Sequence, residues 1–476
     1  MNSFTSIPLM SHEKEIDAIV SQALEEFHVP GIAVAVVVGN KTILCRGYGM
    51  RDLGKELPVT ENTVFPIASN TKAFTSFLIG QLVQEGKVAW DDPVIKYIPE
   101  FRLYNEELTS QVTLRDLIAH RTGIPRHDVL WYLVRDMTEE DILKTLPHFP
   151  PISRLRETFL YNNFMYVVAG KVIHNVTKNT WEKEIYTRIL TPLKMEHSVI
   201  SLEDLQKVAD LSQPYAEIGG KIQELLFLYP RSILASSAIH SSVSDMAKWI
   251  QIQLLEGGAL IEKKNLKEMH EIHMPFAPQS PLGLLHMPFS SLEPSGYGLG
   301  WEIDAYRGRK QVHHGGTTEG FFSEVSLLPE EKIALVILTN SSTDGRYAIS
   351  YIKNRIYDHL LGSQDIDWLQ SIQEKRLEKK QTICLQKFEG LYTHPAYGTM
   401  QIALEHDSLI ATLGRMRVSL KQKEEGVFEA KYPALLTYEV DPIVEFSFFS
   451  NSLGEVNELQ VPFEHFRAAP AIIFKK

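Results

Sequence analysis

The sequence predicts a mixed α+β domain, in which helices pack on an antiparallel sheet, followed by a small antiparallel barrel or sandwich. Three observations support this fold class. A helical pattern precedes a β-hairpin near the N-terminus, a second hairpin precedes a helix within residues 321–361, and short alternating runs fill the chain after Phe388. We therefore expect a first domain over residues 1–365, a charged connector over 366–386 and a β domain over 387–476.

The N-terminal elements begin with a helix. Apolar side chains recur at helical spacing through residues 11–27, where Ser11 is the expected N-cap, and the Pro30-Gly31 pair ends the pattern. Residues 32–38 and 42–48 follow as two strands, and the glycine-containing turn between them is typical of a hairpin. A helix followed by a hairpin indicates helices packed on an antiparallel sheet.

The centre of the chain has a mainly helical pattern. Residues 69–85 predict a helix with one apolar face, and most of residues 86–300 read as helices and loops. Within them, residues 274–300 are rich in Pro, Gly and Ser and predict a long surface loop. The second hairpin and the helix after it are expected at residues 321–328, 333–339 and 348–361.

The β domain is predicted from strand-like runs that turn residues separate at short intervals, a pattern typical of a small barrel or sandwich. These runs lie at residues 399–404, 408–413, 416–420, 427–430 and 444–449. The connector before them is charged and compatible with a helix, but it lacks a strong apolar stripe.

The composition restricts the classes of partner. The formal net charge is −11 and no long basic run is present, which argues against a nucleic-acid-binding surface. No stretch approaches the ~18 apolar residues of a membrane-spanning helix. The N-terminus lacks the pattern of a signal peptide, so we expect a cytoplasmic protein that binds no membrane; a periplasmic protein whose signal peptide has been removed is the alternative. The two cysteines, Cys45 and Cys384, lie in apolar surroundings and are expected to be buried and inert.

The pair Ser69 and Lys72 is the first candidate for chemistry. A serine hydroxyl is a weak nucleophile at neutral pH and needs a neighbouring base, and residues at i and i+3 of a helix share one face. Ser-x-x-Lys occurs three times, also starting at Ser11 and Ser350, but only Ser69 begins a helix directly after an apolar strand-like run. A solvated helix turn is the ordinary explanation of one such short motif, so the pair needs support from other residues.

Tyr161 and Asn163 supply part of that support, because they form the only Tyr-x-Asn of the chain. A tyrosine beside a cationic lysine ionises more easily and can shuttle a proton to a leaving group. The amide of Asn163 can hold a substrate carbonyl or the lysine. A loop tyrosine with a packed ring is the structural alternative.

The segment His314-Gly315-Gly316 supplies the third pattern, after a run that is compatible with a strand. The two glycines allow a ligand to approach a backbone edge closely. The backbone N–H of Thr317 could pair with that of Ser69 as an oxyanion hole, and His314 would supply a titratable donor near the substrate. A glycine-rich turn with exposed histidines is the structural alternative.

In this order the three patterns resemble the Ser-x-x-Lys, Tyr-x-Asn and Lys-Thr-Gly motifs of the serine β-lactamase and penicillin-binding-protein superfamily. The chain is most similar to the class C-like branch with the CubicO group, in which His-x-Gly often replaces Lys-Thr-Gly, as at residues 314–316. The C-terminal region resembles the small lipocalin-like domain often appended to CubicO-group peptidases. Further stretches that resemble this branch lie at residues 117–128, 241–249 and 297–301.

The resemblance implies a β-lactamase/transpeptidase-like domain with an all-helical subdomain, followed by a small antiparallel β-barrel. It also implies roles for single residues: Ser69 is acylated, Lys72 is its base, Tyr161 assists proton transfer, and His314 faces the substrate. The backbone N–H groups of Ser69 and Thr317 would form the oxyanion hole. The resemblance implies no metal and no organic cofactor.

The implied function is hydrolysis of esters or of small peptides and amides through an acyl-enzyme, by an esterase or a D-aminopeptidase-like peptidase. A histidine that is mostly neutral at pH 7 replaces the lysine that recognises a substrate carboxylate, so β-lactam hydrolysis is expected as a side activity at most. The β domain is a common assembly element in the resembling proteins, so a homo-oligomer that forms through it is a candidate arrangement.

Two other classes of function stay open. One is a catalytically idle penicillin-binding-like sensor or assembly protein, although no motif residue is missing. The other is a metalloenzyme, suggested by His270 and His273, but these two lack the spacing of His-Glu-x-x-His and a clear third ligand. An ordinary helix end explains the two histidines better.

Overall fold

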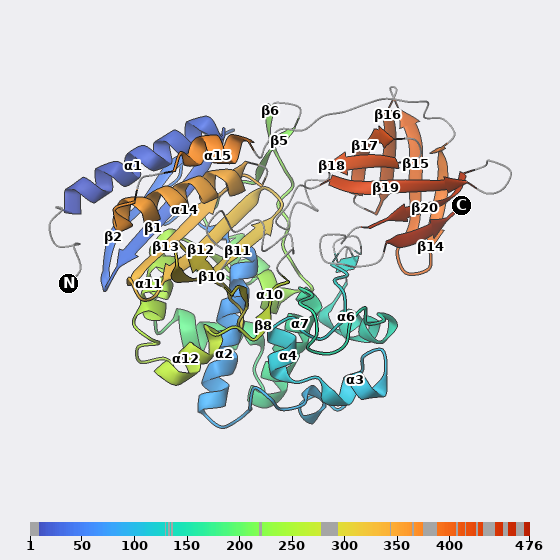
Figure 1. Cartoon of the computed structure of the whole chain (residues 1–476), viewed down its shortest axis with the longest axis horizontal. Coiled ribbons are helices and arrows are strands. Elements are labelled where there is room, and N and C mark those ends of the chain that lie inside the picture. The colour runs from blue at the N-terminus through green and yellow to red at the C-terminus, as the bar shows by residue number, and fades with distance from the viewer. Residues whose placement is uncertain are drawn as a thin grey trace.

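The computed structural model describes the chain from residue 9 to 476, apart from residues 129, 132–133, 135–136, 219–220, 278–293, 343, 364–365, 375–387, 406–407, 415, 425–426, 432–442, 451–455 and 463–470. Figure 1 shows an α+β domain with a separate β-barrel beside it. The predicted fold class is therefore confirmed, and the β domain is a barrel rather than a sandwich.

A single antiparallel sheet forms the centre of the first domain, with the strand order β3-β2-β1-β13-β12-β11-β10-β9-β8. Along β1, Ala33 and Ala35 face one apolar layer and Ile32 and Val34 face the other, as expected for a strand that is buried on both faces. The strands are β1 (Gly31–Val38), β2 (Lys41–Asp52), β3 (Leu57–Pro58), β8 (Met274–Pro275), β9 (Gly296–Tyr297), β10 (Glu302–Tyr306), β11 (Arg309–Thr318), β12 (Phe321–Leu328) and β13 (Ile333–Thr339).

Three helices cover one face of this sheet: α1 (Leu9–Glu26), α14 (Gly345–Leu361) and α15 (Trp368–Glu374), seen at the upper left of Figure 1. Helix α1 begins two residues before Ser11, so the prediction of Ser11 as N-cap is wrong. Leu9 and Met10 are good helix formers and extend the helix past the serine.

The other face packs against α11 (Val243–Leu254) and the turn η2 (Ala68–Asn70), while α2 (Thr71–Gln84) and the remaining helices gather on that side of the sheet (Figure 1). Those helices and helical turns are η3 (Val94–Lys96), α3 (Glu106–Gln111), α4 (Leu114–Ile118), α6 (Glu139–Thr145), η4 (Leu146–His148), α7 (Asn163–Thr177), α8 (Trp181–Ile185), η5 (Tyr186–Leu190), α9 (Leu202–Leu205), α10 (Leu234–Ser237) and α12 (Lys263–Met269). Two small sheets pair β4 (Phe65–Pro66) with β7 (His240–Ser241) and β5 (Tyr215–Ile218) with β6 (Lys221–Glu224).

The predicted surface loop at residues 274–300 is wrong at both of its ends. Met274 pairs with Tyr297 and Pro275 with Gly296, so β8 and β9 extend the sheet by two short strands. The Pro- and Gly-rich composition of this segment does not prevent the pairing of its two ends. Each strand is only two residues long, so few positions have to adopt strand geometry. The centre of the expected loop, residues 278–293, lies outside the described residues.

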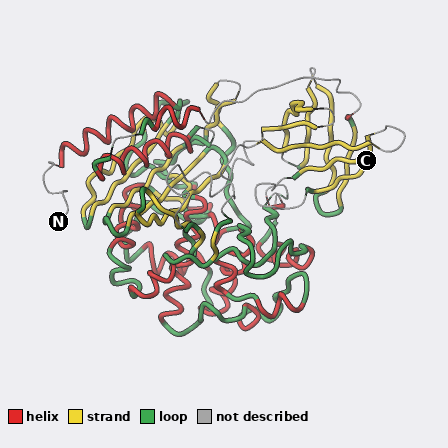
Figure 2. The backbone as a smooth tube through the Cα atoms, viewed as in Figure 1, coloured by secondary structure: helices red, strands yellow, loops and turns green. Residues whose placement is uncertain are grey.

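The eight strands described in the C-terminal domain close into an antiparallel barrel in sequence order (Figure 2). Two residues of the first domain, Trp131 and Leu228, pack against the barrel core. In addition, the hydroxyl of Tyr397 lies 3.2 Å from Nδ1 of His127. The strands are β14 (Gly390–His394), β15 (Gly398–Glu405), β16 (Ser408–Leu413), β17 (Met416–Glu424), β18 (Val427–Lys431), β19 (Ile443–Ser450), β20 (Val456–Val461) and β21 (Ile472–Lys475).

The segment expected as a connector, residues 366–386, contains the helix α15. The side chain of Trp368 in this helix is buried, and its Nε1 donates to Asp358 of α14 across 2.8 Å. The domain boundaries stay a prediction.

Cys45 is half-buried, so the prediction of a buried thiol is wrong for this residue. The reason is that the core covers β2 only in part. Burial still raises the pKa of the Cys45 thiol to about 11, which keeps it protonated at neutral pH. Cys384 lies outside the described residues.

A buried cluster of charges joins β10, β11, β12 and α14. Nε2 of His313 lies 3.3 Å from the carboxylate of Asp304, and its Nδ1 lies 3.5 Å from that of Glu324, which also accepts from Nζ of Lys353 across 2.7 Å. Burial alone would lower the pKa of His313, but the two carboxylates raise it to about 10. Lys353 belongs to the Ser-x-x-Lys motif that starts at Ser350, so in that motif the lysine serves a structural ion pair.

This cluster predicts a pH dependence of stability. The pKa of His313 is raised from 6.5 to about 10, so its contribution is fully present below about pH 6.5 and is lost as the pH rises through 10. We expect the melting temperature of His313→Asn to fall less between pH 7 and pH 9.5 than that of the wild type. The exposed His148 offers a control: His148→Asn should keep the wild-type slope. Equal slopes for all three proteins would contradict the prediction.

Candidate active site

The candidate nucleophile Ser69 lies in the tight turn η2, between β4 and α2. Its predecessor Ala68 has a φ of 45°, in the left-handed region that L residues rarely adopt. Helix α2 starts immediately after this turn and places Lys72 beside Ser69. The Nζ of Lys72 donates to the Oγ of Ser69 across 3.0 Å, and both residues are buried. The structure thus brings the predicted serine and lysine together.

Further contacts hold the amine of Lys72 in place. Its Nζ also donates to the backbone carbonyl of Ser236 in α10 across 3.2 Å. The same atom lies 4.7 Å from the ring centre of Tyr161 and 5.3 Å from that of Tyr166. The carbonyl oxygen accepts an N–H of the amine, and the two aromatic rings pack beside it. These contacts orient the amine toward the serine hydroxyl.

Tyr161 and Asn163 lie at the start of α7, where the side chain of Asn162 caps the helix. The ring of Tyr161 is buried in a small apolar cluster with Tyr297. The Nδ2 of Asn163 donates to the carboxylate of Asp128, which lies on the segment after α4. The predicted Tyr-x-Asn motif therefore joins the Ser-x-x-Lys pair through the contact between Tyr161 and Lys72.

Strand β11 passes directly beside the nucleophile turn at Gly316. A Cβ at this position would overlap the backbone carbonyl of Ile67 and would lie 3.1 Å from the backbone N of Ser69. A Cβ at Gly315 would meet its neighbours at 3.5 Å or more, an ordinary contact distance. The steric need for glycine therefore falls on Gly316. Thr317 follows in the same strand, so its backbone lies on the segment next to Ser69.

His314 is buried and bonded through both ring nitrogens. Its Nδ1 lies 2.6 Å from the carbonyl oxygen of Gly315, and its Nε2 lies 2.9 Å from the hydroxyl of Tyr297. Because a carbonyl only accepts, Nδ1 carries the proton and Nε2 accepts from Tyr297. Burial lowers the pKa of His314 to about 4, Glu302 opposes this shift, and Lys72 adds to it. The imidazole is therefore neutral at pH 7.

Three residues of this arrangement were missed by the motif analysis: Tyr297, Ser236 and Asp128. Tyr297 and Asp128 belong to stretches noted above only as supporting a resemblance. The contribution of Ser236 to Lys72 comes from a backbone carbonyl, which every residue type has, so no residue-type signal marks it.

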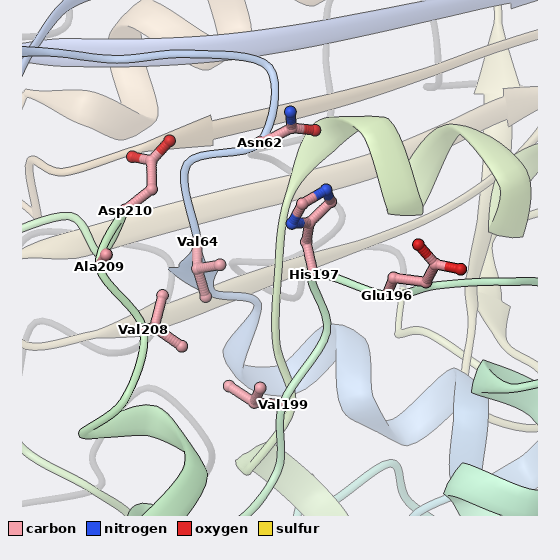
Figure 3. A pocket seen from close by; sticks show the side chains of 8 residues that line it. All are labelled: Asn62, Val64, Glu196, His197, Val199, Val208, Ala209 and Asp210. Atoms are coloured by element: carbon pink, nitrogen blue, oxygen red, sulfur yellow. The ribbon is translucent and has the colours of Figure 1, made fainter.

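A cavity of about 310 Å³ lies apart from these residues (Figure 3). None of the candidate site residues lines it. Of the residues that line it, Val64 is the buried one, and Asn62 and His197 also line it. The carboxylate of Asp210 at the other side already accepts from Thr60 across 2.7 Å.

The two histidines considered as metal ligands lie elsewhere. His273 contacts Arg115 through Nδ1 at 3.2 Å and the backbone carbonyl of Glu268 through Nε2 at 2.8 Å. His270 is buried beside Trp301. Within the part of the chain that the structure describes, no three His, Cys, Asp or Glu side chains gather in a way that could hold a metal ion. No helix in that part is both long and apolar enough to cross a bilayer.

A comparison with family models assigns most of the chain to one family. The beta-lactamase model matches residues 16–355, most of the chain. The protein belongs to the beta-lactamase family. A second family model, described as a domain of unknown function (DUF3471), matches residues 374–475. This range contains the barrel.

Relatives of this family member include hydrolases. Unguisins hydrolase ungD of Aspergillus violaceofuscus (strain CBS 115571) is 28% identical over 431 residues, which cover 81% of this chain and 76% of the relative. Protein flp of Staphylococcus aureus (strain MW2) is 28% identical over 347 residues, which cover 70% of this chain and 64% of that protein.

Solved structures show the same fold. The octameric penicillin-binding protein homologue from Pyrococcus abyssi is 25% identical with a TM-score of 0.66, covering 97% of this chain and 99% of that one. EstCE1, a hydrolase with promiscuous acyltransferase activity, is 16% identical with a TM-score of 0.61, covering 73% of this chain and 99% of that one. The protein is thus a hydrolase of the beta-lactamase type with a C-terminal barrel.

The contact at Gly316 generates a prediction. In Gly316→Ala the new methyl group forces β11 away from Ser69, so we expect the rate of serine acylation to fall by about 100-fold or more. Gly54→Ala is the control, because it lies outside the candidate site and its methyl group would meet only the side chain of Asp52, at the ordinary contact distance of 3.5 Å. The protein is incubated with an activated acyl ester, and the rate of acylation is measured as the increase in the mass of the intact protein over time. Similar rates for the two variants would contradict the steric argument.

Proposed function

We propose that this protein is a serine hydrolase that acts through an acyl-enzyme on Ser69 and cleaves esters or small peptides and amides. The observation that carries the proposal is the 3.0 Å contact between Nζ of Lys72 and Oγ of Ser69 in a buried setting. A serine with a buried amine at hydrogen-bond distance has the base that nucleophilic attack requires. The hydrolase-named relative ungD supports the same class of reaction.

In the proposed reaction, neutral Lys72 takes the proton of Ser69 Oγ as that oxygen attacks the carbonyl carbon of the substrate. The backbone N–H groups of Ser69 and Thr317 donate to the oxyanion that forms. Tyr161, in contact with Lys72, gives its phenol proton to the leaving alkoxide or amine as the bond between that group and the carbonyl carbon breaks. The phenolate then takes the serine proton from the ammonium of Lys72, so both groups return to their starting forms. Water then attacks the acyl ester on Ser69, and the same groups act in reverse.

The substrate class follows from His314 and Asn163. A neutral imidazole with a pKa of about 4 brings no positive charge to a substrate carboxylate at pH 7, so penicillin-like substrates would bind weakly. Gly315 and Gly316 leave the backbone edge of β11 open to the substrate, and Asn163 presents an amide beside Tyr161. These features favour neutral esters and amides, as for an esterase or a D-aminopeptidase-like peptidase.

The test is intact-protein mass spectrometry after incubation with an activated acyl ester, a fluorophosphonate and a penicillin. We expect the ester and the fluorophosphonate to add mass to the wild type and the penicillin to add little. Ser69→Ala should show no adduct, because the only proposed nucleophile is gone.

Ser350→Ala is the matched control, since Ser350 heads another Ser-x-x-Lys motif on α14. It should be labelled like the wild type. A folded wild type that forms no adduct with any probe would overturn the proposal and favour an idle sensor or assembly protein instead.

We further propose that the barrel mediates self-association, in line with the octameric relative of known structure. We expect light scattering to give a mass above that of one 54.1 kDa chain for the full protein and a smaller mass for a chain that ends at Lys380. The barrel could instead limit substrate size, and then the truncated chain gains activity on longer acyl groups. If the mass and the preference for short substrates both stay unchanged, the barrel has neither role.

A further inference from the structure

A buried ion pair lies behind Tyr161, on the segment after α4. Arg126 is 1% exposed and Asp128 is 6% exposed. The Nε of Arg126 donates to Oδ2 of Asp128 across 2.6 Å, and the same oxygen accepts from Nδ2 of Asn163. The guanidinium carbon of Arg126 lies 5.2 Å from the ring centre of Tyr161. Each member of the pair thus contacts a residue of the proposed site.

Fold stability alone does not account for this pair, because a buried ion pair is often no more stable than apolar residues of the same volume. The pair of Arg307 and Asp358, which joins the turn between β10 and β11 to α14, shows the structural use of the same chemistry. There the carboxylate also accepts from Trp368 and so connects three elements of the fold. Asp128 binds Asn163 instead, a residue next to the proposed proton-transfer group.

The contact with Asp128 fixes the orientation of the amide of Asn163. An ionised carboxylate only accepts hydrogen bonds, so the amide nitrogen must face Asp128 and the amide oxygen must point elsewhere. A flip of the amide would bring two acceptors together. Asp128 therefore selects which atom of Asn163 is presented to the site.

Arg126 adds a permanent positive charge at the ring of Tyr161, and positive charge favours a phenolate over a phenol. His314 and Tyr297 add no charge at neutral pH, since burial lowers the pKa of His314 to about 4 and raises that of Tyr297 well above its usual value. The titratable and charged groups that face Tyr161 or its neighbours are Lys72, His120, Arg126, Asp128, Tyr166, Tyr297, Glu302 and His314.

We propose that Asp128 and Arg126 are positioning residues of the hydrolase: Asp128 orients Asn163 and anchors Arg126, and Arg126 holds a fixed positive charge against Tyr161. The inference rests on the proposed function, because it assigns the pair to the acyl-transfer site of Ser69. Neither residue touches the reacting atoms.

The first test measures steady-state hydrolysis of an activated ester. In Asp128→Asn the amide of Asn163 loses its anchor, so kcat should fall by about 10- to 100-fold while KM changes little, as for other supporting residues of catalytic sites. Asp358→Asn is the matched control. It removes a similarly buried carboxylate from the Arg–Asp pair at helix α14, away from the candidate site, and it should lower the melting temperature with little effect on kcat.

The second test is the pH profile of kcat/KM. Arg126→Met removes the charge, so the limb that reports Tyr161 should move to higher pH by roughly one unit. Arg126→Lys keeps the charge and should bring that limb back toward the wild-type position. The double variant Arg126→Met/Asp128→Asn leaves no unpaired buried charge. It replaces a single variant in the assay if that variant does not fold. It should retain the loss of kcat.

The outcomes separate this inference from the proposed function. If the wild type is labelled at Ser69 by fluorophosphonate but the Arg126 and Asp128 variants keep its kcat and pH profile, the positioning role is wrong and the proposed function stands. If the wild type is not labelled at all, the proposed function fails first. A loss of kcat with an unmoved pH limb in Arg126→Met would overturn the electrostatic part.

Discussion

The approach of strand β11 to the turn η2 is the contact on which the rest of the site depends. Gly316 allows the backbone of β11 to contact the backbone of the turn. Ser323 of the neighbouring strand β12 binds the turn as well. Its hydroxyl donates to the carbonyl of Ile67 across 2.8 Å and accepts from Nδ2 of Asn70 across 3.0 Å. These bonds anchor the turn on both sides of Ser69. Because the candidate nucleophile and the candidate oxyanion strand belong to different layers, the candidate site forms only when the sheet and the helices pack together.

Neighbouring histidines on β11 show how one strand serves two environments. His313 lies between two carboxylates, which hold its pKa at about 10, and His314 lies among aromatic rings, where burial lowers its pKa to about 4. Successive side chains of a strand point to opposite faces, so these two adjacent histidines meet different surroundings. At pH 7 His313 is protonated and His314 is neutral. The charged face binds β11 to α14, and the neutral face borders the proposed site.

The sequence was sufficient to predict the fold class and the contact between Ser69 and Lys72, because periodicity and i, i+3 spacing are local properties. Contacts between distant segments left no local signal. Tyr297 reaches His314 from a strand of two residues, and the two glycines of β11 look equivalent in sequence although only Gly316 is confined. The third Ser-x-x-Lys motif gave no warning that its lysine belongs to a buried ion cluster.

The contact between Tyr397 of the barrel and His127 of the first domain has a consequence for engineering. His127 lies between Arg126 and Asp128, so the tip of the β14–β15 hairpin rests on the segment that carries the buried ion pair. Replacing the barrel with one from another relative would therefore alter the support beneath the loop that carries Arg126 and Asp128, besides changing the outer surface. A chimera of this family needs a matched hairpin tip and loop, chosen together as one module.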